Sequence, residues 1–312
     1  MGVGGPTAVG KSHLALTLAQ KINGEIVSVY AGAVYRDMNI GSAKPSPAAQ
    51  RMTPHHLLDV RNPDESFNVG DFCRLALAAA DDIRKRAKAP LFVGGTMMYY
   101  KALREGLHDL PPASPPMRAA LNEEIKNRGL PAMHAELMQL DENTAKILQA
   151  NDGRRIGRAL EVFRITGKPL SLWLKEKRRL LPLRLHAVLL MPSDRRLLRA
   201  RIGERLNGMF ADGLVEETDS VIRRFQLPPT AHVLRLVGYK QAAAFLRGET
   251  DEMTMRKNAE YATCQLAKRQ LSWLRAWSQP LLTIDPFSGA DIEQNILNTA
   301  SVLAKNHGFD MI

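Results

Sequence analysis

The chain has 312 residues, 45% of them hydrophobic and 24% charged, and its formal net charge is +11. A chain of this length buries a sizeable core, and its length fits two packed units better than one. No apolar run approaches the ~18 residues of a membrane span. The two cysteines, Cys73 and Cys264, lie too far apart for a metal-ligand motif and indicate reduced thiols in a cytoplasmic protein. The positive charge favours a large anionic partner such as nucleic acid.

The chain begins with a glycine-rich loop that runs into an amphipathic helix. Residues 5–12 (GPTAVGKS) match G-x-x-x-x-G-K-[ST] in full. In such a loop several backbone N–H groups converge on a phosphate, and the next helix adds the partial positive charge of its N-terminus. Lys11 then reaches the terminal phosphates, and the Ser12 hydroxyl can ligate Mg²⁺. The motif therefore predicts a polyphosphate site.

Strand and helix patterns alternate after this loop. Strand-like runs occur at 25–30 and 90–96, with a helical pattern from about 71 to 88 between them. Only residues 1–4 precede the loop, so the first strand is either stunted or begins upstream of this sequence. The alternation predicts an α/β fold with a parallel sheet flanked by helices, as in P-loop NTPases.

A proline-rich segment at 110–118 interrupts this alternation, because prolines cannot continue a helix or a central strand. From there to about residue 184 every periodic stretch is helical, and strand patterns return at 186–192 and 280–285. We therefore expect a P-loop core domain in two parts, with a helical insertion domain between them. The expected boundaries are 1–111, 112–184 and 185–312.

Basic residues cluster at the end of this insertion and just beyond it. Between Lys175 and Arg205 there are ten basic residues against three acidic ones, and four arginines precede them at 154, 155, 158 and 164. A solvated helix face is the simpler explanation of a charge run, but this clustering favours a surface that contacts a phosphate backbone.

No apolar strand ends in an aspartate that could hold a metal as the second motif of a P-loop kinase does. The strand at 90–96 ends instead in VGGT. Open α/β sheets bind ligands at the carboxyl ends of their strands, which makes Thr96 a candidate site residue. Its hydroxyl could equally cap the helix that follows.

Several sequence blocks occur together in one order, from Gly5 to Arg275. They are GPTAVGKS, VYRDMNIGSAKP (34–45), PHHLLDV (54–60), LFVGGTMMYYKALREGL (91–107), ND-RRI-RALEV (151–162), RLVGYKQ (235–241) and QLAKRQLSWLR (265–275). Single blocks are unspecific, but the set resembles the tRNA dimethylallyltransferase family.

The resemblance implies transfer of the dimethylallyl group of dimethylallyl diphosphate to N6 of the adenosine 3′-adjacent to the anticodon in tRNA, with Mg²⁺. Thr96 would lie near the acceptor amine. The diphosphate would be bound by Gly5, Pro6, Thr7, Ala8, Val9, Gly10, Lys11, Ser12 and Arg205. The tRNA would contact Tyr30, Ala31, Gly32, Ala33, Arg118, Arg154, Arg155, Arg158, Arg235, Gly238, Tyr239, Lys240, Lys268, Arg269, Gln270 and Arg275. The insertion domain would grip the anticodon stem-loop, and nothing in the sequence demands a membrane or more than a monomer.

The chain departs from the family pattern at one critical position. The family strand reads S-x-D-S, and its aspartate accepts the proton of N6; here the same strand carries Tyr30 and Ala31. A tyrosine, with a reference pKa of ~10, accepts protons poorly at neutral pH. We therefore expect turnover slowed by ~10²–10⁴-fold. Asp37 is near in sequence, but nothing in the pattern directs it at the site. A second departure is Cys264, where the family usually carries an arginine.

Three other functions remain open. Tyr30 is compatible with a catalytically weak tRNA-binding member of the family. An adenylate isopentenyltransferase would not need the basic insertion, and a P-loop small-molecule kinase would need the missing metal-binding aspartate. His55 and His56 lack a third ligand at metal-binding spacing, which favours a structural or RNA-side role for the pair.

Overall fold

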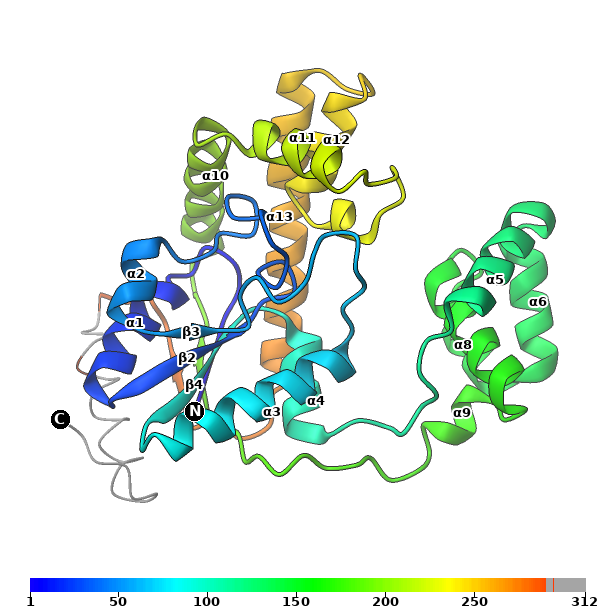
Figure 1. Ribbon diagram of the computed structural model, residues 1–312, viewed down its shortest axis with the longest axis horizontal. Coiled ribbons are helices and arrows are strands. Elements are labelled where there is room, and N and C mark those ends of the chain that lie inside the picture. Colours follow the sequence, from blue (N-terminus) through cyan, green and yellow to red (C-terminus); the bar gives the residue numbers. More distant parts are fainter. Residues whose placement is uncertain (290–293, 295–312) are drawn as a thin grey trace. The chain divides into compact units, whose positions relative to one another are not determined.

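The computed structural model describes residues 1–289 and 294. Its described part contains a six-stranded parallel sheet in the order β3-β2-β4-β1-β5-β6 (Figure 1). The strands are β1 (Gly2–Gly4), β2 (Gly24–Val29), β3 (His55–His56), β4 (Ala89–Gly94), β5 (Ala187–Leu190) and β6 (Leu282–Ile284). β4 and β5 are buried along their whole length, as expected of parallel strands covered on both faces. The predicted α/β class is confirmed.

The strand that carries the glycine-rich loop is short but central. β1 pairs with β4 on one side and β5 on the other, with Val3 opposite Val93 and Val188. Two neighbours supply backbone partners on both edges, which compensates for a strand of three residues. The loop that follows is therefore anchored at the middle of the sheet.

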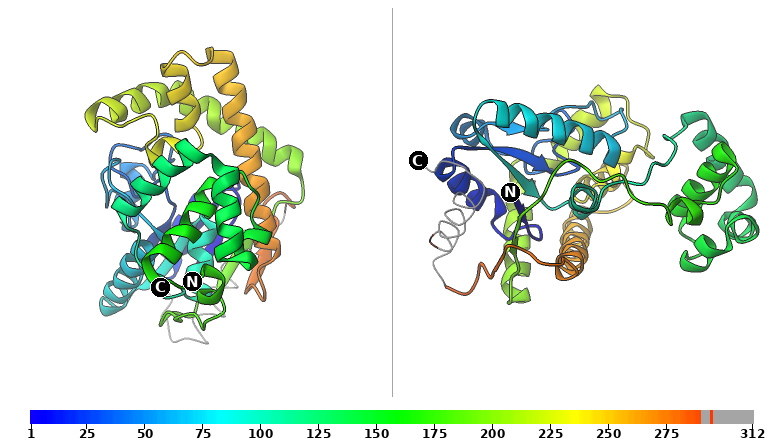
Figure 2. Two further views of the ribbon diagram at one scale, coloured as in Figure 1. Left: turned by 90° about the vertical axis from the view of Figure 1, so that its right-hand side faces the viewer. Right: turned by 90° about the horizontal axis from the view of Figure 1, so that it is seen from below.

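Helices flank the sheet (Figures 1 and 2). Those before the helical insertion are α1 (Lys11–Lys21), α2 (Pro47–Met52), α3 (Val69–Lys85) and α4 (Met97–Glu105), and those after it are α10 (Arg195–Ala211), α11 (Leu214–Arg224), the 3₁₀ helix η1 (His232–Arg235), α12 (Tyr239–Leu246) and α13 (Glu252–Arg275). α1 and α3 each pack on β2 and β4, and α13 packs against α10 and α12. Leu14 and Leu18 of α1 are buried in the main core, as the predicted amphipathic pattern requires.

The chain divides into two compact units: Met1–Leu103 with Leu183–Ile312, and Arg104–Pro182. The second contains α5 (Pro115–Arg128), α6 (Leu130–Leu140), α7 (Glu142–Ile147), α8 (Gly153–Thr166) and α9 (Leu170–Trp173). It has its own core, built from Leu121, Met133, Leu137, Ala145, Ile156, Ala159 and Leu160. The unit begins ahead of the expected boundary at 112 because Leu107 and Arg179 exchange two backbone hydrogen bonds. None of the described helices combines the length and apolar character needed to cross a bilayer.

β3 is the one described strand that the pattern did not predict. It consists of His55 and His56, which pair with Ile26 and Val27 at the edge of the sheet. Two residues carry no period, so no sequence pattern could predict this strand. His56 also contacts the carboxylate of Glu25, with 2.7 Å between its Nε2 and Glu25 Oε2.

Glu25 is a buried carboxylate on β2, and its side chain is 3% exposed. Besides His56, its carboxylate contacts two cations: Oε2 lies 2.5 Å from Arg86 Nη2, and Oε1 lies 3.0 Å from Lys88 Nζ. Burial alone would raise the pKa of Glu25, but the hydrogen bonds from His56, Lys88 and Arg86 hold that pKa below its usual value. The ionised form of Glu25 therefore stabilises the fold.

We expect Glu25→Gln to lower the free energy of unfolding at neutral pH by about 1–3 kcal/mol, a modest figure because Arg86 and Lys88 stay partly solvated. Since the pKa of Glu25 is lowered on folding, this contribution is complete above the pKa of an unfolded glutamate. It is lost as the pH falls through the lowered pKa of the folded state. Urea denaturation of wild type and variant at about pH 7 and about pH 3 measures the loss of unfolding free energy at each pH. The control is Glu142→Gln, which removes an exposed pair with Lys146. An equal loss for Glu25→Gln at both pH values would contradict the prediction.

Candidate active site

The glycine-rich loop at 5–12 connects β1 to α1. Gly10 precedes the helix with φ of 98°, and Ala8 also has a positive φ of 61°. The φ of Gly10 lies in the left-handed region that residues with a side chain disfavour, which is why the motif needs glycine at this position. Lys11 and Ser12 form the first turn of α1, so the positive end of the helix faces the loop. This arrangement suits an anion.

A cavity of about 420 Å³ opens beside the loop. Its lining comes from three segments that lie far apart in the chain: the loop with the start of α1, the residue after β2, and α10. The lining residues are Ala8, Val9, Gly10, Lys11, Ser12, His13, Tyr30, Arg201, Glu204 and Arg205. Three cations against one carboxylate make this a positively charged cavity, suited to a polyphosphate.

Lys11 is the most deeply buried cation of the cavity, with 3% of the residue exposed. Its ammonium group donates a hydrogen bond to the carbonyl of Pro6 at 2.5 Å and lies 5.7 Å from the centre of the Tyr30 ring. Burial lowers the pKa of Lys11 and Arg205 lowers it further, whereas Tyr30 opposes both. A buried ammonium gains most from a negatively charged ligand, because little water solvates it.

Tyr30 follows directly after β2 and is half-buried. Burial alone would raise the pKa of its hydroxyl, but the charges of Lys11 and Arg205 bring that pKa below the usual tyrosine value. A larger fraction of Tyr30 is therefore ionised at neutral pH, and able to accept a proton, than of an ordinary tyrosine. The same two cations that favour its ionised form also line the anion cavity.

Thr96 follows β4 at the same edge of the sheet. Its hydroxyl accepts a hydrogen bond from the backbone N–H of Ala31 at 3.0 Å, and its own N–H donates to Val29 at 3.1 Å. Thr96 thus fixes the backbone on both sides of Tyr30. This hydroxyl therefore bonds to the turn after β2.

Tyr239 and Gln270 are two of the buried residues among those expected to contact tRNA. Tyr239 is 0% exposed and donates from its hydroxyl to Glu217 at 2.7 Å. Gln270 is 4% exposed and lies between the P-loop and the turn after β4, where it bonds Thr7 and Gly95. Both side chains lie on the inner faces of their helices, whereas the motif blocks alone do not say which face is inward. Both side chains face inward in this structure, and contact of these two residues with tRNA remains a prediction.

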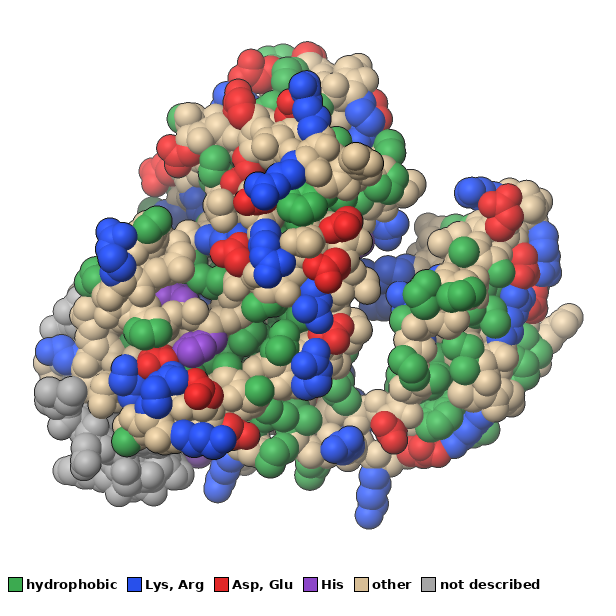
Figure 3. Space-filling model, viewed as in Figure 1, with side chains coloured by type: hydrophobic (Ala, Val, Ile, Leu, Met, Phe, Trp, Pro, Cys, Tyr) green, Lys and Arg blue, Asp and Glu red, His purple; other side chains and the backbone are tan. Residues whose placement is uncertain are grey.

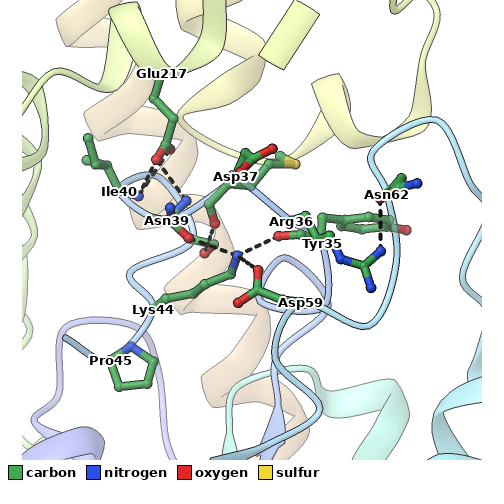
Figure 4. A network of polar contacts seen from close by, with 12 residues as sticks. Tyr35, Arg36, Asp37, Asn39, Ile40, Lys44, Pro45, Asp59, Asn62 and Glu217 are labelled. Atoms are coloured by element: carbon green, nitrogen blue, oxygen red, sulfur yellow. Dashed lines mark hydrogen bonds and ion pairs between the residues drawn. The ribbon is translucent and has the colours of Figure 1, made fainter. Parts of the chain in front are cut away.

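The loop after Tyr30 is held by a polar network (Figure 4). The Glu217 carboxylate accepts from the backbone N–H groups of Asn39 at 2.8 Å, Ile40 at 2.8 Å and Gly41 at 3.2 Å. Lys44 donates to the Tyr35 carbonyl and to Asp59, each at 2.5 Å. Sequence reasoning missed Glu217, because a carboxylate that binds backbone groups leaves no pattern.

Asp37 in this loop forms an ion pair with Arg224 at 3.0 Å. Its carboxylate is therefore engaged with α11, and it is not among the residues that line the cavity. Asp37 therefore does not supply the carboxylate that is missing at position 30.

Comparison with known proteins places these features in a family. Residues 33–277 match the family described as IPP transferase. The chain belongs to the IPP transferase family. A tRNA dimethylallyltransferase of Thiobacillus denitrificans is 47% identical over 273 residues, which cover 88% of this chain and 87% of the relative. One from Azoarcus sp. is 46% identical over 301 residues, covering 95% and 93%.

Solved structures agree with this assignment. A tRNA isopentenylpyrophosphate transferase of Bacillus halodurans is 30% identical with a TM-score of 0.68, and the match covers 97% of this chain and 95% of that one. A eukaryotic dimethylallyltransferase acting on tRNA, 24% identical, has the same fold with a TM-score of 0.80 over 99% and 80% of the two chains. The IPP transferase match spans residues of both compact units.

The other residues that the resemblance assigned to tRNA lie in two places in this IPP transferase. In the first unit the side chains of Arg235, Lys240, Lys268, Arg269 and Arg275 are exposed, Ala31 and Gly32 are partly exposed, and Ala33 and Gly238 are buried. On the face in Figure 3 basic side chains alternate with acidic ones and form no single basic patch. The predicted phosphate-backbone surface is therefore not concentrated on this face.

In the helical unit, Arg118 and Arg158 share one buried carboxylate, Glu161, at 3.1 Å and 2.7 Å. Burial alone would raise the pKa of Glu161, but the hydrogen bond from Arg158 and the charge of Arg118 hold it below the usual value. Arg154 and Arg155 are exposed on α8, the helix that also carries Arg158 and Glu161. Glu161 thus brings Arg118 of α5 together with the arginines of α8.

Proposed function

We propose that this chain transfers the dimethylallyl group of dimethylallyl diphosphate to N6 of the adenosine 3′-adjacent to the anticodon in tRNA. One observation carries the proposal: Lys11, Tyr30 and Arg205, far apart in the sequence, line a single cavity at the P-loop. The family and the names of its relatives supply the reaction class.

The reaction needs a site for a leaving diphosphate beside a site for a nucleophile. N6 attacks the C1 carbon of the dimethylallyl group, the C–O bond breaks, and the diphosphate leaves with the electron pair. Lys11, Arg205 and the N-terminus of α1 stabilise the added negative charge, because these groups are fixed before the charge develops. N6 then loses a proton, which the ionised hydroxyl of Tyr30 would accept.

A magnesium ion fits this site as a partner of the diphosphate. Among the described residues there is no cluster of three or more His, Cys, Asp or Glu side chains that could hold a metal ion. Mg²⁺ commonly keeps several waters and binds through substrate phosphates, so the Ser12 hydroxyl and the diphosphate oxygens suffice. When bound, it would neutralise charge on the leaving group.

The helical unit, Arg104–Pro182, would grip the anticodon stem-loop through Arg118, Arg154, Arg155 and Arg158. The exposed basic residues of α13 and the 235–240 segment would hold the RNA near the cavity. An adenosine must leave its stack to react, and unstacked loop bases are the usual targets of RNA recognition. We place the activity in the cytoplasm and assign it to a monomer.

Incubation with Mg²⁺, labelled dimethylallyl diphosphate and unmodified tRNA tests the proposal, with tRNA binding followed in the same samples. We expect label to enter the tRNA slowly, and binding to weaken steeply between about 50 and about 200 mM salt. A matched tRNA that lacks adenosine at the position after the anticodon should bind but take up no label.

Tight, salt-sensitive binding without transfer would support the alternative of a catalytically weak family member, which the tyrosine at position 30 favours. Label transfer to free AMP with no tRNA binding would indicate an adenylate isopentenyltransferase. Phosphoryl transfer from ATP would indicate a kinase. Neither binding nor transfer by the folded protein would refute the proposed function.

A further inference from the structure

Gln270 joins two loops of the candidate active site. Its side-chain oxygen accepts a hydrogen bond from the backbone N–H of Thr7 at 2.9 Å. Its side-chain nitrogen donates to the backbone carbonyl of Gly95 at 2.8 Å. Both bonds are buried, and both cross from α13 to segments more than a hundred residues away in the chain. One amide therefore spans the P-loop and the turn after β4.

The fit around this amide is tight. A Cβ atom on Gly95 would lie 2.5 Å from the Gln270 side-chain nitrogen, closer than such atoms can approach. Gly95 therefore leaves room for the amide to reach the carbonyl. The amide is thus closely packed against the turn after β4.

The two loops serve the two halves of the proposed reaction. Thr7 belongs to the loop that leads to Lys11 and the anion cavity. Gly95 immediately precedes Thr96, whose hydroxyl holds the backbone of Ala31 next to Tyr30. Gln270 therefore connects the diphosphate side of the site to the acceptor side.

We propose that Gln270 is a positioning residue that sets the spacing between the leaving diphosphate and the adenosine acceptor. This inference rests on the proposed function for its effect on catalysis. Glutamine suits the task because its amide offers one acceptor and one donor group at the end of a single side chain. Ionised glutamate offers only acceptors, and methionine offers neither a donor nor a strong acceptor.

The test compares Gln270→Met and Gln270→Glu with a control on the same helix, Thr263→Val. Thr263 is also buried, but its hydroxyl donates to the Ala259 carbonyl within α13. For each protein we would measure the unfolding temperature, the Kd of inorganic pyrophosphate with Mg²⁺, and kcat and KM for dimethylallyl transfer to tRNA.

We expect Gln270→Met to lower kcat by about 100-fold, because misplacement by about 1 Å has an effect of that size. The Kd of pyrophosphate should rise by about tenfold, because the P-loop loses its anchor. Thr263→Val should lower the unfolding temperature while leaving kcat and Kd within about twofold. A merely structural role would move the unfolding temperature alone.

Gln270→Glu provides a second measurement, the pH dependence of kcat, that a loss of stability alone would not change. Its kcat defect relative to wild type should shrink as the pH falls from about 8 to about 6, because a protonated glutamate regains a donor for Gly95. The defect of Gln270→Met relative to wild type should not change over that range. If Gln270→Met fails to fold, the pH dependence of Gln270→Glu decides the matter.

Unchanged kcat and Kd in both Gln270 variants would overturn the inference and leave the proposed function intact. Equal losses of kcat in Thr263→Val would overturn it as well. If the wild-type protein transfers no label, the proposed function fails, and pyrophosphate binding alone tests whether Gln270 holds the P-loop in place. A tenfold loss of pyrophosphate affinity in Gln270→Met would then support this role, and an unchanged affinity would refute it.

Discussion

Replacing Tyr30 by aspartate is expected to raise the rate of dimethylallyl transfer by about 10²–10⁴-fold, the usual contribution of a general base. An aspartate, with a reference pKa of ~3.9, is ionised at neutral pH and ready to accept the N6 proton. The lowered pKa of Tyr30 narrows this advantage without removing it. The backbone next to position 30 is held in place, since the Thr96 hydroxyl accepts a hydrogen bond from the N–H of Ala31.

Single-turnover transfer of label to saturating tRNA measures this change directly. Tyr30→Phe is the matched control, because it keeps the ring and removes only the hydroxyl, and it should give no gain. Below the pKa of Tyr30 the wild-type rate should rise about tenfold per pH unit, because only ionised tyrosine accepts the proton. The Tyr30→Asp rate should be nearly independent of pH in the neutral range. No gain in Tyr30→Asp would refute the assignment of this position as the base.

Lys11→Met is expected to lower kcat/KM for dimethylallyl diphosphate by about 10²–10³-fold, the loss seen when one preorganised donor to a developing anion is removed. The ammonium of Lys11 is buried and lines the anion cavity. Methionine fills similar space and removes a buried charge, which offsets the lost hydrogen bond to the Pro6 carbonyl, so the unfolding temperature should change little. The affinity for inorganic pyrophosphate should decrease in parallel.

The control for Lys11→Met is Lys21→Met, at the exposed end of the same helix. That variant removes an equal charge from the protein but not from the cavity. It should keep both kcat/KM and pyrophosphate affinity within about twofold of wild type. A loss of less than about tenfold in Lys11→Met would mean that the diphosphate does not bind at this loop.

The fold class and the P-loop could be predicted because they depend on local pattern. The motif around Lys11 requires a particular loop shape in any context, and buried parallel strands are continuous apolar runs. The place of Arg205 beside Lys11 came only from the family resemblance, since no periodicity connects α10 to the loop. Its presence in the cavity is a fact of tertiary structure.

Residues whose roles depend on which way a side chain faces could not be predicted. Gln270 and Tyr239 belong to recognisable blocks, yet each is turned inward to a partner that lies far away in the sequence. Glu217 binds three backbone N–H groups, and backbone groups have no sequence signature. Glu161 shows the same limit, because its partner Arg118 lies on another helix.

The place of β1 between β4 and β5 has a consequence for how the chain folds as it is synthesised. Its first neighbour, β4, leaves the ribosome before the helical unit, and its second neighbour, β5, leaves after that unit. Domains generally fold as units in the order of their synthesis. The helical unit has its own core, so we expect it to fold while β1 still has one unpaired edge. The P-loop would then become rigid only after the helical unit has formed.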